Sequence, residues 1–327
     1  MSTVSTALLL LFLVVTPAFA QTGTWVRQRA GTMAWLHGLF FLDQNRGFVV
    51  GSKGTLLQTL DGGNTWKSRG SYTEDVVRDI FFTDEQNGWM VVEVNAYQLK
   101  TKEEPRAYLM KTIDGGEHWK RIEIKGFDVD AILVRAVFNR NGRGWTFGEG
   151  GSIYTTHDAG DTWIKLQSPT RRLLLGGIFV DDDRGWIVGA GATIIQTSDG
   201  GETWYQSTLP QVEKSVRFTA TSFVDNRKGW AVGSGGSVYQ TTNGGRTWLQ
   251  QNSTVAVDLF DVKFVDALEG WAVGAEGTII HTSDGGDHWA AMPSDTRHPL
   301  ERVFFADKNH GWAVGFGGTV VSYQLQK

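Results

Sequence analysis

The sequence predicts an all-β protein, a seven-bladed β-propeller built from four-stranded blades. Two short phrases recur along the chain at a spacing typical of one blade, and segments with helical spacing of apolar residues are absent beyond the first twenty residues. In addition, the amino-terminal segment repeats the strand that the last unit lacks. The two ends of the propeller are therefore expected to meet in one blade.

The first phrase is polar and glycine-rich, and it ends in tryptophan. It reads TSDGGETW at 197–204 and TSDGGDHW at 282–289. A short acceptor side chain before two glycines predicts a tight turn, because the acceptor binds N–H groups of the turn and glycine adopts positive φ at little cost. This phrase is the Asp-box, or bacterial neuraminidase repeat. We expect a structural role for the acceptors of its six copies, which are Asp61, Asp114, Asp158, Asp199, Asn243 and Asp284.

The second phrase is glycine followed by an aromatic and apolar residues, as in GWAVG at 270–274. Together the phrases divide each unit into four short strands joined by tight turns, as in VKFVDALEGWAVGAEGTIIHTSDGGDHW at 262–289. The seven aromatic residues, 41 to 56 residues apart, are Phe48, Trp89, Trp145, Trp186, Trp230, Trp271 and Trp312. Five residues before the aromatic, six units carry an expected turn aspartate and one carries Arg140: Asp43, Asp84, Asp181, Asp225, Asp266 and Asp307.

The seventh unit ends at TVVSYQLQK without a fourth strand. The segment TGTWVRQ at 22–28 matches GETWYQS at 201–207, so the amino-terminal strand is expected to complete the last blade. This closure would remove the free edges of a linear array. Of the 14 tryptophans, only Trp35 falls outside the two repeated positions.

The first twenty residues predict a signal peptide, because the apolar run 7–15 is too short to span a bilayer and Ala18-Phe19-Ala20 follows it. Residues 21–327 are expected to form one monomeric domain, exported to the periplasm, thylakoid lumen or extracellular space, without stable membrane insertion. The net charge of −4 argues against nucleic-acid binding. With no cysteine and no histidine cluster of ligand spacing, no metal and no cofactor is expected.

Departures from the repeat suggest a partner-binding face. In a propeller the first strand begins on the same face as the loop between the second and third strands, so the insertion Glu93–Ala107 is expected near the channel mouth. Arginine suits recognition of carboxylates and polar backbone. Four arginines are expected to be exposed there, Arg78, Arg135, Arg217 and Arg302. Acidic residues share these loops, so a solvated rim and an inert extended hairpin are the alternatives.

Catalysis is not expected, because six equivalent carboxylates, one per blade, cannot converge on one substrate. Asp-boxes also occur in sialidases and other glycoside hydrolases, so a glycoside hydrolase or a glycan-binding propeller is the alternative to a protein-binding scaffold. The glycine-rich segments GAGATI at 189–194 and GSGGSV at 233–238 open strands rather than helices, which argues against nucleotide binding.

The combined pattern F-x-D-x-x-x-G-W-A-V-G-x-x-G-T-I-x-x-T-x-D-G-G-x-T-W, repeated over 22–323, resembles the photosystem II stability and assembly factor family. The resemblance implies a seven-bladed, non-enzymatic assembly factor. Its client would be a photosystem reaction-centre subunit, or another membrane protein, held through an arginine-rich patch. Arg78, Arg135 and Arg302 match that patch in position, and Arg217 matches it less closely. The lipid anchor of cyanobacterial members needs a cysteine, which this chain lacks.

Overall fold

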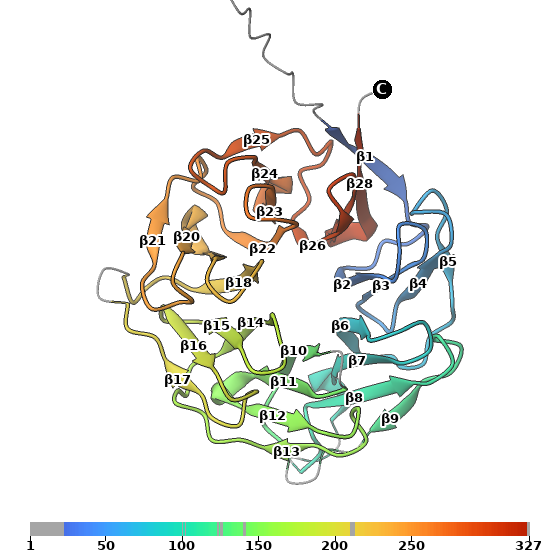
Figure 1. Ribbon diagram of the computed structural model, residues 1–327. Coiled ribbons are helices and arrows are strands. Elements are labelled where there is room, and N and C mark those ends of the chain that lie inside the picture. The colour runs from blue at the N-terminus through green and yellow to red at the C-terminus, as the bar shows by residue number, and fades with distance from the viewer. Residues whose placement is uncertain are drawn as a thin grey trace, which may run out of the picture.

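The computed structural model describes residues 23–325 except 100, 102, 123, 125–126, 140–141 and 210–212. The expected signal peptide, its boundary at residue 20 and Arg140 lie outside the described residues. Seven four-stranded antiparallel sheets form a ring, with the first strand of each sheet nearest the central channel (Figure 1). The predicted seven-bladed propeller is therefore confirmed. No described helix has the length and apolar character needed to cross a membrane.

The strands of the seven blades follow one another in chain order. Blade 1 has β2 (Leu36–Phe41), β3 (Gly47–Gly51), β4 (Leu56–Thr59) and β5 (Lys67–Ser68). Blade 2 has β6 (Val76–Phe82), β7 (Gly88–Glu93), β8 (Ala107–Thr112) and β9 (Lys120–Ile122). Blade 3 has β10 (Leu133–Phe138), β11 (Gly144–Gly148), β12 (Ile153–Thr156) and β13 (Ile164–Lys165). Blade 4 has β14 (Leu174–Phe179), β15 (Gly185–Gly189), β16 (Thr193–Thr197) and β17 (Tyr205–Gln206).

The remaining blades repeat the arrangement. Blade 5 has β18 (Phe218–Phe223), β19 (Gly229–Gly233), β20 (Val238–Thr241) and β21 (Leu249–Gln251). Blade 6 has β22 (Leu259–Phe264), β23 (Gly270–Gly274), β24 (Ile279–Thr282) and β25 (Ala290–Met292). Blade 7 has β26 (Leu300–Asp307), β27 (His310–Gly315), β28 (Thr319–Leu325) and β1 (Gly23–Arg29). Short 3-10 turns are η1 (Ala96–Gln98), η2 (Glu149–Gly151), η3 (Ser234–Gly236), η4 (Ala275–Gly277) and η5 (Phe316–Gly318).

The two ends of the chain meet in blade 7, as predicted. Strand β1 pairs antiparallel with β28 from Gly23 opposite Leu325 to Arg29 opposite Thr319. Trp25 is only 2% exposed and meets Phe305 edge-on, with 5.8 Å between ring centroids. The amino-terminal strand therefore supplies the fourth strand and the tryptophan that the other blades take from their own Asp-box.

Each interface between blades is built around three aromatic rings. Phe264, at the end of the first strand of blade 6, stacks on Trp230 of blade 5 at 3.4 Å between centroids. It also meets the Asp-box tryptophan of its own blade, Trp289, edge-on at 5.7 Å. The same triplet recurs at all seven interfaces, where the phenylalanines are Phe41, Phe82, Phe138, Phe179, Phe223, Phe264 and Phe305. These stacks bury large apolar surfaces and explain why both tryptophan positions repeat.

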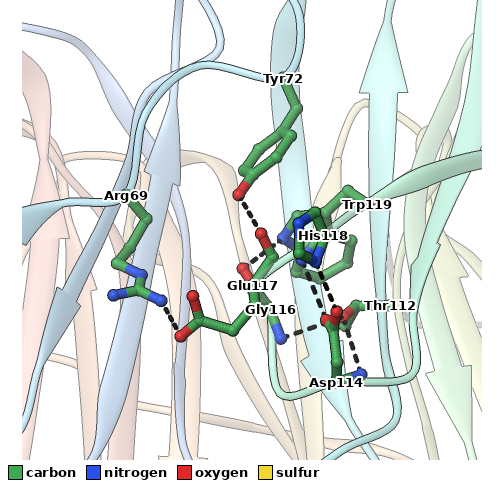
Figure 2. Close-up of polar contacts among 8 residues, drawn as sticks. All are labelled: Arg69, Tyr72, Thr112, Asp114, Gly116, Glu117, His118 and Trp119. Carbon is green, nitrogen blue, oxygen red and sulfur yellow. Dashed lines mark hydrogen bonds and ion pairs between the residues drawn. The ribbon is translucent and has the colours of Figure 1, made fainter.

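The Asp-box closes the turn between the third and fourth strands (Figure 2). In blade 2 the Thr112 hydroxyl donates to the Asp114 carboxylate at 2.8 Å and accepts the Gly116 N–H at 3.0 Å. Asp114 also accepts the backbone N–H of His118 at 3.0 Å and contacts its imidazole Nδ1 at 2.8 Å. These hydrogen bonds, led by the backbone N–H of His118, lower the pKa of Asp114 to about 2. The carboxylate is thus occupied within its own turn.

The turn between the first and second strands uses the second aspartate series. Asp43 Oδ1 accepts the N–H groups of Asn45 and Arg46 at 2.7 and 2.8 Å. Asp84, Asp181, Asp225, Asp266 and Asp307 make the same pair of bonds. These turns and the Asp-boxes share one face of the ring, which we call the box face. The first strands begin on the opposite face, the mouth face.

Candidate functional site

Every first strand carries a β-bulge close to its start. The residue within the bulge and the residue after it lie at two different depths of the channel. The residue within the bulge faces the channel entrance in all seven blades: His37, Arg78, Val134, Leu175, Thr219, Phe260 and Glu301. These seven residues line one cavity of about 460 Å³, which we call the mouth cavity. Because every blade contributes, the cavity is the open end of the central channel.

The walls of the mouth cavity differ in character. Blades 3, 4 and 6 contribute apolar side chains, namely Ile132, Val134, Leu173, Leu175 and Phe260. Blades 1, 2 and 7 contribute mainly polar and charged groups, among them Arg78, Glu93 and Arg302. Blade 5, between the apolar blades 4 and 6, adds Arg217 and Thr219, and blade 3 also adds Glu149. Most of the apolar side chains therefore lie across the cavity from a charged wall, in which Arg78 and Arg302 stand beside Glu93 and Glu301.

The residue that follows each bulge forms the layer below the cavity. Four of these positions are charged and three are small: Asp79, Arg135, Asp261 and Arg302, with Gly38, Gly176 and Ala220. Arg135 Nη2 donates to Asp261 Oδ1 at 3.1 Å, and the two side chains are 14% and 9% exposed. Blades 3 and 6 lie three blades apart in a ring of seven, so this ion pair crosses the channel and closes the cavity from below.

The remaining charges of this floor are held in place by backbone groups. Asp261 Oδ2 accepts the Val303 N–H at 3.1 Å, and Asp79 Oδ2 accepts the Ala136 N–H at 3.3 Å. Arg302 Nη1 donates to the Glu301 carbonyl at 2.9 Å. Burial raises the pKa of Asp79, and burial together with the nearby Arg135 charge lowers the pKa of Arg302. The floor is a neutral cluster of two acids and two arginines.

Three of the four predicted arginines, Arg78, Arg217 and Arg302, line the mouth cavity. Arg78 forms an ion pair with Glu93 at 2.6 Å, and Arg217 lies 3.6 Å from Asp258. Arg135 and Arg302 lie in the floor, where the Nε atoms of both are buried, and the expectation that these two arginines are exposed is wrong. The bulge is the physical reason, because it directs Arg78 to the entrance and the residue one position later, as in Arg135, into the channel.

The insertion Glu93–Ala107 emerges on the mouth face beside the cavity. Its anchor on blade 2 is Asp75, which accepts the Asn95 N–H at 3.0 Å. On the blade 3 side, Arg106 lies 3.7 Å from Glu149, a residue that lines the mouth cavity. The insertion therefore borders the entrance over blades 2 and 3.

Trp35 is a site residue whose role sequence reasoning missed. It stands at the rim of the mouth cavity, 41% exposed, and its indole N–H donates to Glu301 at 3.1 Å. Phe316 meets it edge-on at 5.3 Å between centroids. The signal was present in the sequence, because Trp35 is the one tryptophan outside the repeated positions.

The carboxylates of the mouth cavity do not form a free pair. Glu93 is bound by Arg78, Glu149 lies beside Arg106, and Glu301 accepts the Trp35 indole N–H. A glycoside hydrolase of the common type needs two acids flanking the scissile bond. Among the described residues, no group of His, Asp and Glu is arranged to hold a metal ion.

His37 makes the stability of the cavity wall depend on pH. It is 6% exposed, and burial, with Arg78 and Arg302 nearby, lowers its pKa to about 3. The unfolded chain binds a proton near pH 6.5 and the folded chain does not, so stability through this residue falls as the pH drops. Below pH 6.5, and down to pH 5, the free energy of unfolding should fall by about 1 kcal/mol for each pH unit through this residue.

We expect His37→Gln to remove that part of the pH dependence. Urea unfolding at pH 7, 6 and 5 measures it. His157→Gln is the matched control, because His157 is half exposed on the box face. If wild type and His37→Gln lose equal free energy between pH 7 and 5, His37 is not held neutral in the fold.

Comparisons with known proteins agree on one family. A family model described as photosynthesis system II assembly factor YCF48 matches residues 18–75, 70–173, 163–253 and 249–324. The photosystem II stability/assembly factor HCF136 of Arabidopsis thaliana is 30% identical over 128 residues, which cover 37% of this chain and 28% of that protein. The photosystem II assembly lipoprotein Ycf48 of Synechococcus sp. (strain CC9902) is 25% identical over 146 residues, 44% of this chain and 40% of the relative. The matched segments thus span well under half of these curated relatives.

Solved structures show the same fold. A structure described as YCF48 bound to D1 peptide has a TM-score of 0.76 at 20% identity and covers 92% of this chain and 96% of that chain. A GH74 xyloglucanase from Xanthomonas campestris reaches 0.73 at 13% identity, covering 93% of this chain and 54% of the enzyme. The fold alone therefore does not separate binding from hydrolysis. The family matches, in contrast, run through all seven blades, and by them the chain belongs to the photosystem II assembly factor YCF48 family, as the repeated pattern predicted.

Proposed function

We propose that this protein is an exported, non-enzymatic assembly scaffold that holds an extended segment of a photosystem reaction-centre subunit in the mouth cavity. The observation that carries the proposal is the cavity itself. It is lined by all seven blades, closed below by the Arg135–Asp261 ion pair, and has an apolar wall across from a charged wall of arginines and glutamates. A family relative has been solved with a D1 peptide, which supports a peptide as the ligand.

The two walls suggest how a segment would be held. Apolar side chains of the client would pack against Leu175 and Phe260, and carboxylates or backbone carbonyls would face Arg78 and Arg217. These two arginines have side chains that are 37% and 48% exposed, so they remain accessible despite their acidic neighbours. Trp35 offers the large aromatic anchor that dominates many interfaces. The charges would set register and speed association more than they add affinity.

The proposal predicts that loss of the two accessible arginines weakens client capture without unfolding the protein. We expect Arg78→Gln combined with Arg217→Gln to lower the affinity for peptides from the client's exported segments by about tenfold. The melting temperature should change little, since exposed substitutions typically cost under about 0.5 kcal/mol each. Fluorescence anisotropy with a peptide series covering those segments measures the affinity.

Lys67→Gln combined with Lys120→Gln is the matched control, because both lysines are exposed on the outermost strands β5 and β9 and their replacement also removes two positive charges. Equal affinity in the arginine variant and this control would contradict the proposed use of Arg78 and Arg217. The glycoside hydrolase alternative is tested separately with aryl-glycosides and sialosides. Turnover that disappears on Glu301→Gln, with the fold intact, would overturn the scaffold.

A further inference from the structure

Neighbouring blades also meet on the box face, and there the charges follow a rule. The residue before the Gly-aromatic motif is a lysine or arginine in blades 1, 3, 4 and 5, as Arg46, Arg143, Arg184 and Lys228. The residue after the two Asp-box glycines is acidic in four blades, as Glu117, Asp161, Glu202 and Asp287. Between blades 3 and 4 the rule produces an ion pair, because Arg143 binds Glu202 and its guanidinium lies directly against the turn at Gly200.

The contact between blades 4 and 5 breaks this rule. Arg246 occupies the position of the acid, so the basic Arg184 of blade 4 meets a second cation. At the next contact, between blades 5 and 6, the basic residue again lies against the Asp-box turn. Lys228 Nζ is 2.8 Å from where a Cβ of Gly285 would stand. Nothing of Arg184 comes within 4 Å of the equivalent point at Gly244. Arg184 and Arg246 line the same groove instead, with no acid among its lining residues.

The inverted contact forms a polar groove of about 640 Å³. Three exposed arginines line it, Arg184, Arg227 and Arg246, and none of them has an ion-pair partner among the described residues. The groove has no acidic lining residue, and its Asp-box is the one in which Asn243 replaces the aspartate. In a chain of net charge −4, this is a local concentration of unneutralised positive charge.

The acids of two adjoining turns make hydrogen bonds within those turns. Asp199 accepts the backbone N–H of Thr203 at 3.0 Å inside its own Asp-box. Asp225 accepts the N–H groups of Arg227 and Lys228 at 2.7 and 2.6 Å within its turn. Neither carboxylate is among the groove's lining groups. The backbone N–H of Lys228 and the nearby charge of Arg227 lower the pKa of Asp225, but no described acid forms an ion pair with any of the three guanidinium groups.

We propose that the groove between blades 4 and 5 binds an acidic segment of a second protein. Guanidinium groups match carboxylates bidentately. The amides of Gln196, Asn226 and Asn243 can pair with the peptide backbone, and Tyr205, 60% exposed, offers an aromatic face. An anionic membrane would gain only about 1 kcal/mol per arginine through charge, and the groove adds no exposed apolar side chain beyond Tyr205, since Trp186 is 2% exposed.

The groove lies on the box face, whereas the proposed client site opens on the mouth face. The two sites can therefore be occupied together, and the scaffold would bring the client of the mouth cavity close to a second, acidic partner. The groove inference does not depend on the proposed function, because its residues and its test are separate from the mouth cavity.

The substitution Arg246→Glu tests the groove sharply. It introduces the acid that four other blades carry at this position. Arg184 should then form an ion pair with residue 246, as Arg143 does with Glu202, and the fold should stay intact. The probe is a fluorescent ten-residue peptide rich in Asp and Glu, compared with the same peptide carrying Asn and Gln. We expect wild type to bind the acidic peptide selectively and in a salt-dependent way. Arg246→Glu should weaken that binding by about tenfold or more.

Two variants control for location. Lys67→Glu makes the same charge change on the outer strand of blade 1 and should bind the acidic peptide as wild type does. Lys120→Gln removes one exposed positive charge from the outer strand of blade 2 and should leave peptide binding unchanged. Equal binding by Arg246→Glu and wild type, or an equal loss in Lys67→Glu, would overturn the groove.

Further arms separate the ligand sources. Displacement of the peptide by inorganic phosphate, at ionic strength matched with chloride, would indicate a general oxyanion site and overturn the acidic-segment assignment. Vesicles that contain anionic lipid provide the last arm. Binding to these vesicles that depends on Arg246, without binding of the peptide, would assign the groove to a lipid surface instead.

Discussion

A chain that begins at Gly31 should unfold at a markedly lower temperature than the full chain. Without β1, strand β28 loses its partner along seven residue pairs and becomes an exposed sheet edge. The deletion also removes Trp25 from a cluster with Phe305 and Tyr323, and deletion of a buried tryptophan side chain alone costs about 3–5 kcal/mol. Thermal melting followed by circular dichroism, together with urea unfolding, measures the difference.

Point variants separate the packing of Trp25 from the loss of the strand. Trp25→Ala keeps the backbone pairing and should still lower the unfolding free energy by about 3–5 kcal/mol. Trp35→Ala is the matched control, because Trp35 is 41% exposed and should contribute little to stability. If the shortened chain and Trp25→Ala both melt with the full chain, then β1 does not close the ring.

The number of blades and their closure could be predicted because each blade repeats residues that the fold needs in every copy. The aromatic triplet at every interface requires a Gly-aromatic position, an Asp-box tryptophan and a phenylalanine, and all three are visible as sequence periodicity. Trp25 was identifiable by the same logic. For the aromatic triplet and Trp25, the local sequence pattern and the assembled fold therefore point to the same structure.

The layering of the channel could not be predicted, because a β-bulge leaves no mark in composition. Counted back from the Gly-aromatic residue of each unit, Arg78 lies one position earlier than Arg135 and Arg302, and the structure keeps this offset relative to the bulges. Because of the bulge, this difference of one residue places Arg78 in the half-exposed wall of the cavity and Arg135 in its enclosed floor. The ion pair between Arg135 and Asp261 joins residues 126 positions apart in the chain, and only the closed ring brings them together.

The charge inversion at Arg246 was present in the sequence but could not be interpreted there. Its meaning depends on which residue of the preceding blade lies opposite, and that pairing is a property of the assembled ring. The same holds for Trp35, whose exception to the repeat was visible while its place at the rim of the cavity was not.

Asp261→Asn should be among the most destabilising single substitutions in the molecule, although it only replaces one carboxylate oxygen by an amide NH2 group. The floor of the mouth cavity contains two acids and two arginines, and the substitution leaves Arg135 and Arg302 opposed by Asp79 alone. Removal of one partner of a buried ion pair costs about 3–5 kcal/mol, because the remaining charge stays desolvated. Urea unfolding at pH 7 measures this loss.

The double variant Asp261→Asn with Arg135→Gln distinguishes the charge imbalance from the loss of a contact. It leaves Asp79 and Arg302 as a balanced pair, so it should be more stable than Asp261→Asn alone, and the coupling energy of the cycle should be favourable. Arg78→Gln is the control, since its ion pair with Glu93 has a 37% exposed arginine and should contribute about 1 kcal/mol or less. If Asp261→Asn costs no more than Arg78→Gln, water screens the channel floor and the cavity is not closed from below. If it costs as predicted, the cross-channel pair is desolvated and closes the mouth cavity from below, as the proposed binding of a client segment requires.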